Sequence, residues 1–217
     1  MDFERARFNM VEQQIRPWEA IGPDIRRLLM AARRENYVPP PIRTLAFADI
    51  EAPLPCGQAM LKPAIEGRIL QALGTKRVGS ALEIGTGSGY FAALLASRSE
   101  KVYTVEIEPE LVQLARGNLA RNGVTNVSVE EGDGAQGWFA QAPYDIIVVS
   151  GGLPELPGAL LAQLKPGGSL FVFVGEEPVM KARLVVRENE KQLQCRDLFE
   201  TQAPMLRHAL STSEFLL

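Results

Sequence analysis

The sequence is poor in the residues that crosslink small proteins or bind metal ions. Among its 217 residues it has only two cysteines, Cys56 and Cys195, and one histidine, His208. The cysteines are far apart in the chain and form no C-x-x-C pair, so we expect neither a disulfide framework nor a zinc or other metal site. Both thiols are expected to be free and reduced. Nothing around His208 indicates a catalytic base, and we expect it to lie at the surface.

Long apolar runs and an excess of basic residues are also absent. No apolar stretch approaches the ~20 residues of a membrane span, and the first ten residues, MDFERARFNM, lack the apolar core of a signal peptide. Lys and Arg number 23 against 26 Asp and Glu, whereas nucleic-acid binders usually carry a basic face. We therefore expect a soluble, cytoplasmic protein that binds neither membranes nor nucleic acid. The sequence does not indicate its oligomeric state.

Residues 1–75 show the periodicity of amphipathic helices. Apolar side chains recur every three to four residues in 3–15, 23–36 and 63–73, which predicts three helices. A run of three prolines that begins at Pro39 lies between the second and third, and we expect it to be a rigid, extended link. The segment is therefore expected to form an N-terminal helical cap with a Pro-rich crossover.

From residue 78 onward, short apolar runs alternate with helical segments. Five strands are expected at 78–84, 102–105, 127–129, 144–149 and 169–174, with helices at 91–96, 109–122 and 157–164. Strands this apolar are typical of a parallel sheet covered on both faces. Two further segments, 181–187 and 191–199, flank a polar turn and predict an antiparallel edge. Residues 76–217 are therefore expected to form an α/β domain with a doubly wound, mostly parallel, Rossmann-like sheet.

A glycine turn joins the first of these strands to the helix that follows it. The stretch Gly85-Thr86-Gly87-Ser88-Gly89 has the pattern G-x-G-x-G, which lets a ligand lie against bare backbone and the free N–H groups of a helix start. A dinucleotide fold needs G-x-G-x-x-G, and Tyr90 stands where its third glycine is expected, which argues against NAD. A tight turn without a ligand is the alternative interpretation of the glycines alone.

Acidic residues follow the expected strand ends. Glu106 closes the strand after the glycine turn, where a carboxylate can accept hydrogen bonds from both ribose hydroxyls of an adenosine. Ile107 follows it and is expected to form an apolar wall against the adenine. Asp133, in the sequence Gly132-Asp133-Gly134, is expected at the adenine amino group, although an ordinary Asx turn is the alternative at that position.

Together with these acids, the stretch from Leu82 to Tyr90 resembles the first motif of class I S-adenosylmethionine-dependent methyltransferases. The resemblance implies that the cofactor is S-adenosyl-L-methionine. The residues expected to bind it are Glu83, Gly85, Thr86, Gly87, Ser88, Gly89, Glu106, Ile107, Asp133 and Gly134.

A longer series of motifs resembles the protein-L-isoaspartate O-methyltransferases, in order and over nearly the whole chain. It comprises Val38-Pro39, Ala46-Phe47-Ala48-Asp49, Gly57-Gln58, Pro63, the glycine turn, Gly132-Asp133-Gly134, Gly137-Trp138, Ala142-Pro143-Tyr144-Asp145 and the segment from Leu164 to Gly168. The resemblance implies a repair enzyme that methylates the carboxylate of isoaspartyl residues in damaged proteins or peptides. A carboxylate with a pKa near ~4 is already ionised at neutral pH, so this chemistry needs no dedicated base.

One segment departs from the family pattern at the expected acceptor site. Family members usually continue Thr-Ile-Ser after Gly-Gln, and the resemblance implies that this serine faces the methyl group and the isoaspartyl carboxylate. Here Leu61 takes its place and no catalytic residue is assigned; the expected substrate-facing residues are Gln58, Ala59, Met60, Leu61 and Lys62. A second, milder departure is Ser150-Gly151-Gly152-Leu153-Pro154, where a small Ala-rich turn is expected.

Three functions stay open on the sequence alone. The first is an isoaspartyl carboxyl methyltransferase whose activity is weakened by the loss of the hydroxyls. The second is a cofactor-binding relative that has lost this catalysis and serves a regulatory or interaction role. The third is a methyltransferase for another acceptor, such as a small metabolite or RNA.

Overall fold

The seven-stranded sheet at the centre of the protein has the order β5-β4-β3-β6-β7-β8-β9. The computed structural model describes residues 1–17 and 21–209. The strands are β3 (Val78–Ile84), β4 (Ser99–Glu106), β5 (Val127–Glu131), β6 (Tyr144–Leu153), β7 (Leu164–Glu176), β8 (Val179–Arg187) and β9 (Leu193–Thr201). From β5 to β7 neighbouring strands are parallel, and β8 and β9 are antiparallel. The predicted doubly wound, mostly parallel sheet with an antiparallel edge is confirmed.

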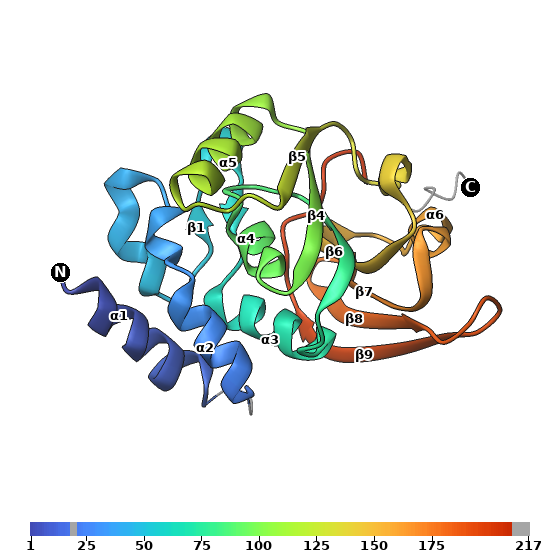
Figure 1. Ribbon diagram of the computed structural model, residues 1–217, viewed down its shortest axis with the longest axis horizontal. Helices are drawn as coiled ribbons and strands as arrows, with labels where there is room; N and C mark the ends of the chain where they lie inside the picture. The colour runs from blue at the N-terminus through green and yellow to red at the C-terminus, as the bar shows by residue number, and fades with distance from the viewer. Residues whose placement is uncertain (18–20, 210–217) are drawn as a thin grey trace.

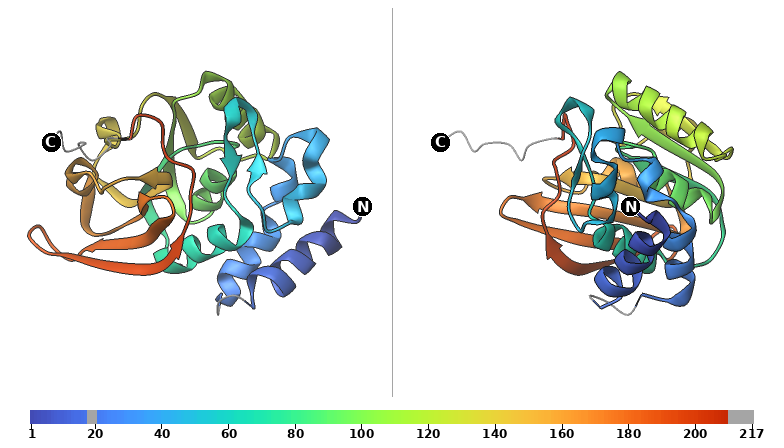
Figure 2. Two further views of the ribbon diagram at one scale, coloured as in Figure 1. Left: turned by 180° about the vertical axis from the view of Figure 1, so that it is seen from behind. Right: turned by 90° about the vertical axis from the view of Figure 1, so that its left-hand side faces the viewer.

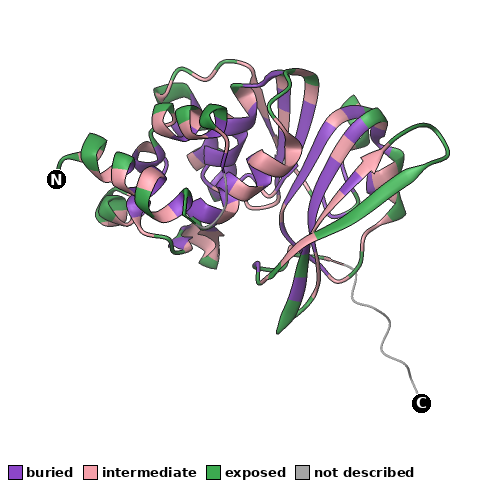
Figure 3. Ribbon diagram, turned by 90° about the horizontal axis from the view of Figure 1, so that it is seen from below, coloured by how far each residue is buried: buried purple, intermediate pink, exposed green. Residues whose placement is uncertain are grey.

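Both faces of the parallel strands are buried, as their continuous apolar runs predict. In β7, Leu170 and Val172 belong to one buried cluster, while Phe171 and Phe173 belong to the other. Alternating side chains of a strand point to opposite faces, so each strand contributes to both cores. The helices that cover the sheet are α3 (Pro63–Leu73), α4 (Tyr90–Ala96), α5 (Pro109–Arg121) and α6 (Gly158–Ala162). Figure 3 shows the buried residues running through the sheet and the exposed outer part of the last hairpin.

The N-terminal cap lies at one end of the molecule and the β8–β9 hairpin at the other (Figure 1). The helix predicted over 3–15 is helical throughout, but it divides into α1 (Phe3–Asn9) and a π-helix, η1 (Met10–Ile15). The second predicted helix ends earlier, as α2 (Pro23–Ala31), and a 3₁₀ turn, η2 (Arg34–Asn36), follows. Side chains of the cap share one buried cluster with α4, α5 and one face of the sheet.

The prediction of an extended link at the prolines is wrong. Pro40 opens a 3₁₀ segment, η3 (Pro40–Phe47). Proline has a fixed φ and lacks an N–H, and both properties suit the first turn of a helix, where that N–H has no intrahelical partner. Composition alone did not distinguish a helix start from an extended linker here.

The largest errors in element bounds concern β7 and the crossover before α3. β7 begins at Leu164 and runs through Lys165-Pro166-Gly167-Gly168, the segment expected to be a turn, with a register shift opposite Tyr144 and Ile146 of β6. The crossover forms a two-stranded antiparallel sheet, β1 (Ala52–Pro53) and β2 (Ala59–Met60), around a short turn, η4 (Pro55–Gly57). A two-residue strand is too short to produce a periodicity in the sequence.

A buried ion pair joins η2 of the cap to α3. Arg34 is fully buried and donates to both carboxylate oxygens of Glu66 at 2.6 and 2.7 Å. The same guanidinium donates to the carbonyl oxygens of Ala46 and Leu61 and lies 5.1 Å from the centroid of the Tyr90 ring. A planar group with five donors can join this many segments, which a lysine could not do. The position of Leu61 therefore depends on Arg34.

Figure 2 shows the segment that follows β9 running back alongside β1 and β2. Within the residues that the structure describes, no helix is long and apolar enough to cross a membrane. Cys56 is half-buried and Cys195 is exposed, and neither forms a disulfide.

Candidate cofactor and acceptor site

The C-terminal ends of the parallel strands form the wall of a cleft, which we call the outer cleft. The strand order changes direction at β3, which has β4 on one side and β6 on the other, and ligands bind at such switch points. The predicted site residues that line the outer cleft are Gln58, Ala59, Gly85, Gly87, Glu106, Ile107, Asp133 and Gly134. Three separate motifs of the sequence thus converge on one cleft, as their positions after consecutive strands predict.

The glycine turn requires glycine at each of its three positions. Gly85, Gly87 and Gly89 have φ angles of 90°, 53° and 83°, in the left-handed region that disfavours side chains. A Cβ on Gly89 would lie 3.3 Å from Ala115 of α5, so this glycine also permits close packing of two helices. Gly89 lines no described pocket, and its role is to shape the turn.

Glu106 holds the glycine turn through its carboxylate. Oε2 accepts a hydrogen bond from the Gly87 N–H at 2.8 Å, and Oε1 accepts from the N–H groups of Ile107 and Glu108 at 3.0 and 3.1 Å. The residue is only 6% exposed. A carboxylate has about four acceptor positions, so one position on Oε2 is left for a hydroxyl group of a ligand in the cleft.

Asp133 forms the Asx turn that was one of the two alternatives from the sequence. Its Oδ1 accepts from the N–H of Ala135 at 2.9 Å, which is the Asx turn, while the residue also lines the outer cleft. His208 is exposed, and its Nδ1 lies 3.1 Å from Asp133 Oδ2. Gly134 allows close packing behind the cleft, because a Cβ there would lie 2.8 Å from Ile84.

A second, smaller pocket continues from the outer cleft on the other side of the glycine turn, and we call it the inner pocket. The two share Ala59, Gly85, Gly87 and Ser150. The inner pocket is otherwise lined by Leu54, Met60, Leu61, Glu66, Glu83, Thr86, Ser88, Tyr90 and Phe91. The hydroxyl group of Tyr90 is buried without a hydrogen-bond partner in the described structure. The pocket therefore combines apolar side chains with two carboxyl groups, the phenol of Tyr90 and three hydroxyl-bearing residues, Thr86, Ser88 and Ser150.

Glu83 is fully buried beneath the glycine turn. Its Oε2 accepts from the Thr104 hydroxyl at 2.7 Å and its Oε1 from the Ser150 hydroxyl at 3.1 Å. Burial raises the pKa of Glu83 to about 8, against the lowering effect of these two hydrogen bonds. Hydroxyl groups donate and accept equally well, so they also satisfy the protonated carboxyl group. Burial likewise raises the pKa of Glu66 to about 7, although Arg34 favours its ionised form.

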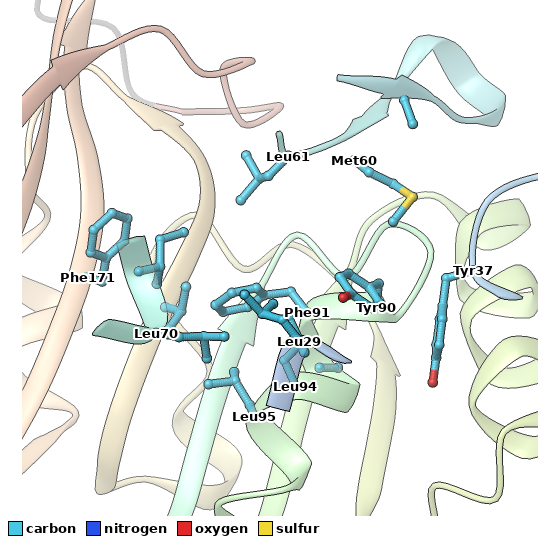
Figure 4. Close-up of a cluster of buried hydrophobic side chains, with 14 of the residues drawn as sticks. Leu29, Tyr37, Met60, Leu61, Leu70, Tyr90, Phe91, Leu94, Leu95 and Phe171 are labelled. Atoms are coloured by element: carbon cyan, nitrogen blue, oxygen red, sulfur yellow. The ribbon is translucent and has the colours of Figure 1, made fainter. Parts of the chain in front are cut away.

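Leu61 and Met60 form the apolar roof of the inner pocket. Figure 4 shows both side chains on the same side of the buried cluster, above the rings of Phe91 and Tyr90. Leu61 is 9% exposed, and its carbonyl oxygen accepts from Arg34 at 2.8 Å. The segment that departs from the family pattern is therefore a fixed, packed element of the structure.

Lys62 lies outside both pockets, exposed at the start of α3. Sequence reasoning missed four cleft residues that follow β9, Pro204, Met205, Leu206 and Arg207, as well as Ser150. The pair Gly151-Gly152 was the available signal, since adjacent glycines often mark a close approach of another backbone. Across the part of the chain that the structure describes, no group of three or more His, Cys, Asp and Glu side chains could hold a metal ion.

The raised pKa of Glu83 predicts a pH dependence of stability. The folded protein retains a proton on Glu83 up to about pH 8, whereas the unfolded chain loses it near the ordinary value of 4.5. Folding is therefore progressively disfavoured as the pH rises through this window. We expect Glu83→Gln, which imitates the protonated carboxyl group, to show a smaller decrease in the free energy of unfolding between pH 5 and pH 8 than the unaltered protein.

Urea unfolding at a series of pH values measures this difference. Part of the slope will remain in the variant, because Glu66 titrates in the same window. Glu188→Gln, which removes an exposed carboxylate from the β8–β9 turn, is the matched control and should leave the slope unchanged. Equal slopes for Glu83→Gln and the unaltered protein would contradict the raised pKa.

Comparison with known proteins identifies relatives over most of the chain. The family model described as Protein-L-isoaspartate(D-aspartate) O-methyltransferase (PCMT) matches residues 8–203. A protein-L-isoaspartate O-methyltransferase of Methanoculleus marisnigri is 43% identical over 188 residues, which are 85% of this chain and 84% of the relative. One of Koribacter versatilis is 38% identical over 192 residues, 88% of this chain and 86% of the relative.

Solved structures share the fold. A Plasmodium falciparum chain assigned as a protein-L-isoaspartate O-methyltransferase, crystallised in complex with S-adenosyl-L-homocysteine, superposes with a TM-score of 0.79. The match covers 93% of this chain and 98% of that chain, at 19% identity. The prediction made from the sequence motifs is confirmed: the chain belongs to the protein-L-isoaspartate(D-aspartate) O-methyltransferase (PCMT) family.

Proposed function

We propose that this protein is an S-adenosyl-L-methionine-dependent O-methyltransferase that methylates the carboxylate of isoaspartyl residues in proteins or peptides. Its membership of the PCMT family supports the reaction class and the cofactor. The observation that carries the proposal is the convergence of the glycine turn, Glu106 and Asp133 on the outer cleft. The comparisons give no support to the alternative of a relative without catalysis.

The outer cleft fits the adenosine part of this cofactor. Glu106 offers a free acceptor position for a ribose hydroxyl, Ile107 an apolar surface for the base, and Asp133 an acceptor for the adenine amino group. The glycine turn leaves the inner pocket continuous with the cleft, so the amino-acid end can pass beside Gly85 and Gly87. A side chain at Gly87 would narrow this passage, since its Cβ would lie 3.2 Å from Cδ1 of Leu54.

The residues of the chain act on the acceptor by orienting it and excluding water. When bound, S-adenosylmethionine supplies an electrophilic methyl group. An isoaspartyl carboxylate is ionised at neutral pH, so no protein group has to remove a proton. Ala59 and Ser150 lie where the outer cleft and the inner pocket meet, and the apolar Met60 and Leu61 adjoin that point. Alignment and desolvation of the carboxylate are then the main contributions of the protein.

Removal of the Glu106 carboxylate should weaken cofactor binding. We expect Glu106→Ala to lose roughly 1.5–3 kcal/mol of binding free energy for S-adenosyl-L-homocysteine, the range for hydrogen bonds to a charged group. Isothermal titration calorimetry measures this loss, and Glu106→Gln is the matched variant that keeps the size of the side chain. NAD should not bind measurably. Tight binding of NAD, or unchanged affinity in Glu106→Ala, would disprove the assignment of the cleft.

The leucine at position 61 should limit turnover of an isoaspartyl peptide. A serine hydroxyl there could donate to the acceptor carboxylate, whereas leucine can neither donate nor accept. At about 1.4 kcal/mol per tenfold, a missing bond of roughly 1.5–3 kcal/mol corresponds to a loss of about one to two powers of ten in rate. We expect Ala59→Thr/Leu61→Ser to raise steady-state turnover of an isoaspartyl peptide at least about tenfold.

Cofactor affinity and the free energy of unfolding have to be measured on the same variant. Leu61 is buried, and its truncation will destabilise the protein by an amount typical of a large-to-small core substitution, about 2–5 kcal/mol. Leu54→Ser, in the wall of the same pocket, is the control for a cavity without a correctly placed hydroxyl. Robust turnover by the unaltered chain would show that the hydroxyls are dispensable here.

A further inference from the structure

The segment Ala203–His208, which we call the C-terminal strap, forms the side of the outer cleft opposite the strand ends. Four of its residues line the cleft: Pro204, Met205, Leu206 and Arg207. Gly152 of β6 exchanges two main-chain hydrogen bonds with the strap: its N–H donates to Pro204 O at 2.8 Å, and its carbonyl oxygen accepts from the N–H of Leu206 at 2.9 Å. One end of the strap is therefore fixed to the sheet by backbone contacts.

This first attachment explains the glycine pair in the segment that departs from the family pattern. A Cβ on Gly151 would lie 2.7 Å from Cδ2 of Leu206, and one on Gly152 would lie 2.8 Å from Sδ of Met205. Both distances are too short for a Cβ, so a side chain at either position would displace these side chains of the strap, and at Gly152 it would also meet Cε of Met180 on β8 at 2.3 Å. Gly151 and Gly152 thus allow the strap to lie directly on the end of β6.

Arg207 makes the second attachment, across the cleft. One of its guanidinium nitrogens donates to the carbonyl oxygen of Cys56, in the turn before β2, at 3.1 Å. The other forms an ion pair with Glu108, two residues after Glu106. In the right-hand view of Figure 2 the strap runs beside the β1–β2 segment, in agreement with the contact between Arg207 and Cys56. A single side chain therefore joins the strap, the crossover turn and the start of α5, which are three walls of the cleft.

A third contact, between His208 of the strap and Asp133, joins two exposed side chains. The attachments at Gly152 and Arg207 differ in strength and accessibility. The attachment at Gly152 consists of two backbone hydrogen bonds, and the side chain of Leu206 packs beside them. The attachment at Arg207 is an ion pair between side chains that are 46% and 19% exposed, those of Arg207 and Glu108. Water and salt compete with a partly exposed ion pair, so such pairs break at low cost. The Arg207 end is therefore the end at which the strap can open. Arg207 is also the only cationic residue that lines the outer cleft in the described part of the chain.

We propose that Arg207 is a latch, a positioning residue that holds the C-terminal strap closed over the bound cofactor and sets how fast cofactor and product leave. The proposal rests on the proposed function, because it takes the outer cleft to be the cofactor site. Opening of a lid and release of product set the turnover rate of many enzymes. Loss of the latch is then expected to raise the KM for S-adenosylmethionine without lowering kcat, because product also leaves faster.

Stopped-flow measurement of S-adenosyl-L-homocysteine dissociation tests the latch directly. We expect Arg207→Ala to dissociate about three- to tenfold faster, the effect of losing a partly exposed ion pair and one charged hydrogen bond. Arg207→Lys should restore part of the slow rate. Rising salt should speed dissociation from the unaltered protein and leave Arg207→Ala nearly unaffected, because only the former has an ion pair to screen.

Variants of Glu108, the ion-pair partner of Arg207, and of a distant ion pair serve as controls. Glu108→Gln should also speed dissociation, and the double variant Arg207→Ala/Glu108→Gln should be no faster than Arg207→Ala, because both substitutions break one interaction. Arg183 forms a similar ion pair with Asp197 on the β8–β9 hairpin, where neither residue lines the cleft. Arg183→Ala should leave the dissociation rate unchanged.

Hydrogen exchange of the Ala209 amide separates failure of the latch from failure of the proposed function. In the ligand-free protein this N–H donates to the Leu206 carbonyl oxygen across the turn that contains Arg207, and Arg207→Ala should speed its exchange about threefold or more while the free energy of unfolding stays within error. If S-adenosyl-L-homocysteine does not bind the unaltered protein, the assignment of the outer cleft as the cofactor site is wrong. The exchange result still decides whether Arg207 holds the strap closed. Unchanged exchange and unchanged dissociation in Arg207→Ala would overturn it.

Discussion

The structure of the site depends on one carboxylate that fixes a glycine turn. Because β3 and β4 are parallel neighbours, their C-terminal ends meet, and Glu106 at the end of β4 can accept from the N–H of Gly87 at 2.8 Å. The N–H groups of Gly85 and Thr86 donate to the carbonyl oxygen of Val105, the residue before Glu106. These bonds hold the turn in left-handed conformations that only glycine adopts without strain. The direction of α4, the outline of both pockets and the position of Asp133 beside them follow from this arrangement.

The part of this arrangement that is local or follows from strand order could be predicted from the sequence. Glycines with a strand before and a helix after identify the turn, and acids at the ends of successive parallel strands must meet at one edge of the sheet. The contribution of the C-terminal strap could not be predicted in this way. It depends on a contact between β6 and a segment about fifty residues later, and only the pair Gly151-Gly152 hinted at it.

The inner pocket shows a second limit of sequence reasoning. Glu66 and Arg34 are ordinary polar residues of amphipathic helices in the sequence, yet they form a fully buried ion pair whose cation also holds the Leu61 carbonyl oxygen. A helical period identifies which face is buried, but not which distant side chain will neutralise a charge on it. The family pattern drew attention to Leu61. In the structure its side chain packs over the inner pocket, and its carbonyl oxygen accepts a hydrogen bond from Arg34. The leucine that replaces the family's serine is therefore part of the packed core of the protein.

At the outer cleft, the protein transfers a methyl group from bound S-adenosylmethionine to an isoaspartyl carboxylate. The most direct measurement is transfer of labelled methyl from S-adenosylmethionine to two peptides of one sequence, which differ only in an isoaspartyl or an aspartyl linkage. We predict label in the isoaspartyl peptide alone, as a methyl ester that releases methanol in mild base. Equal labelling of both peptides, or no label in either while S-adenosylmethionine binds the cleft, would contradict the account.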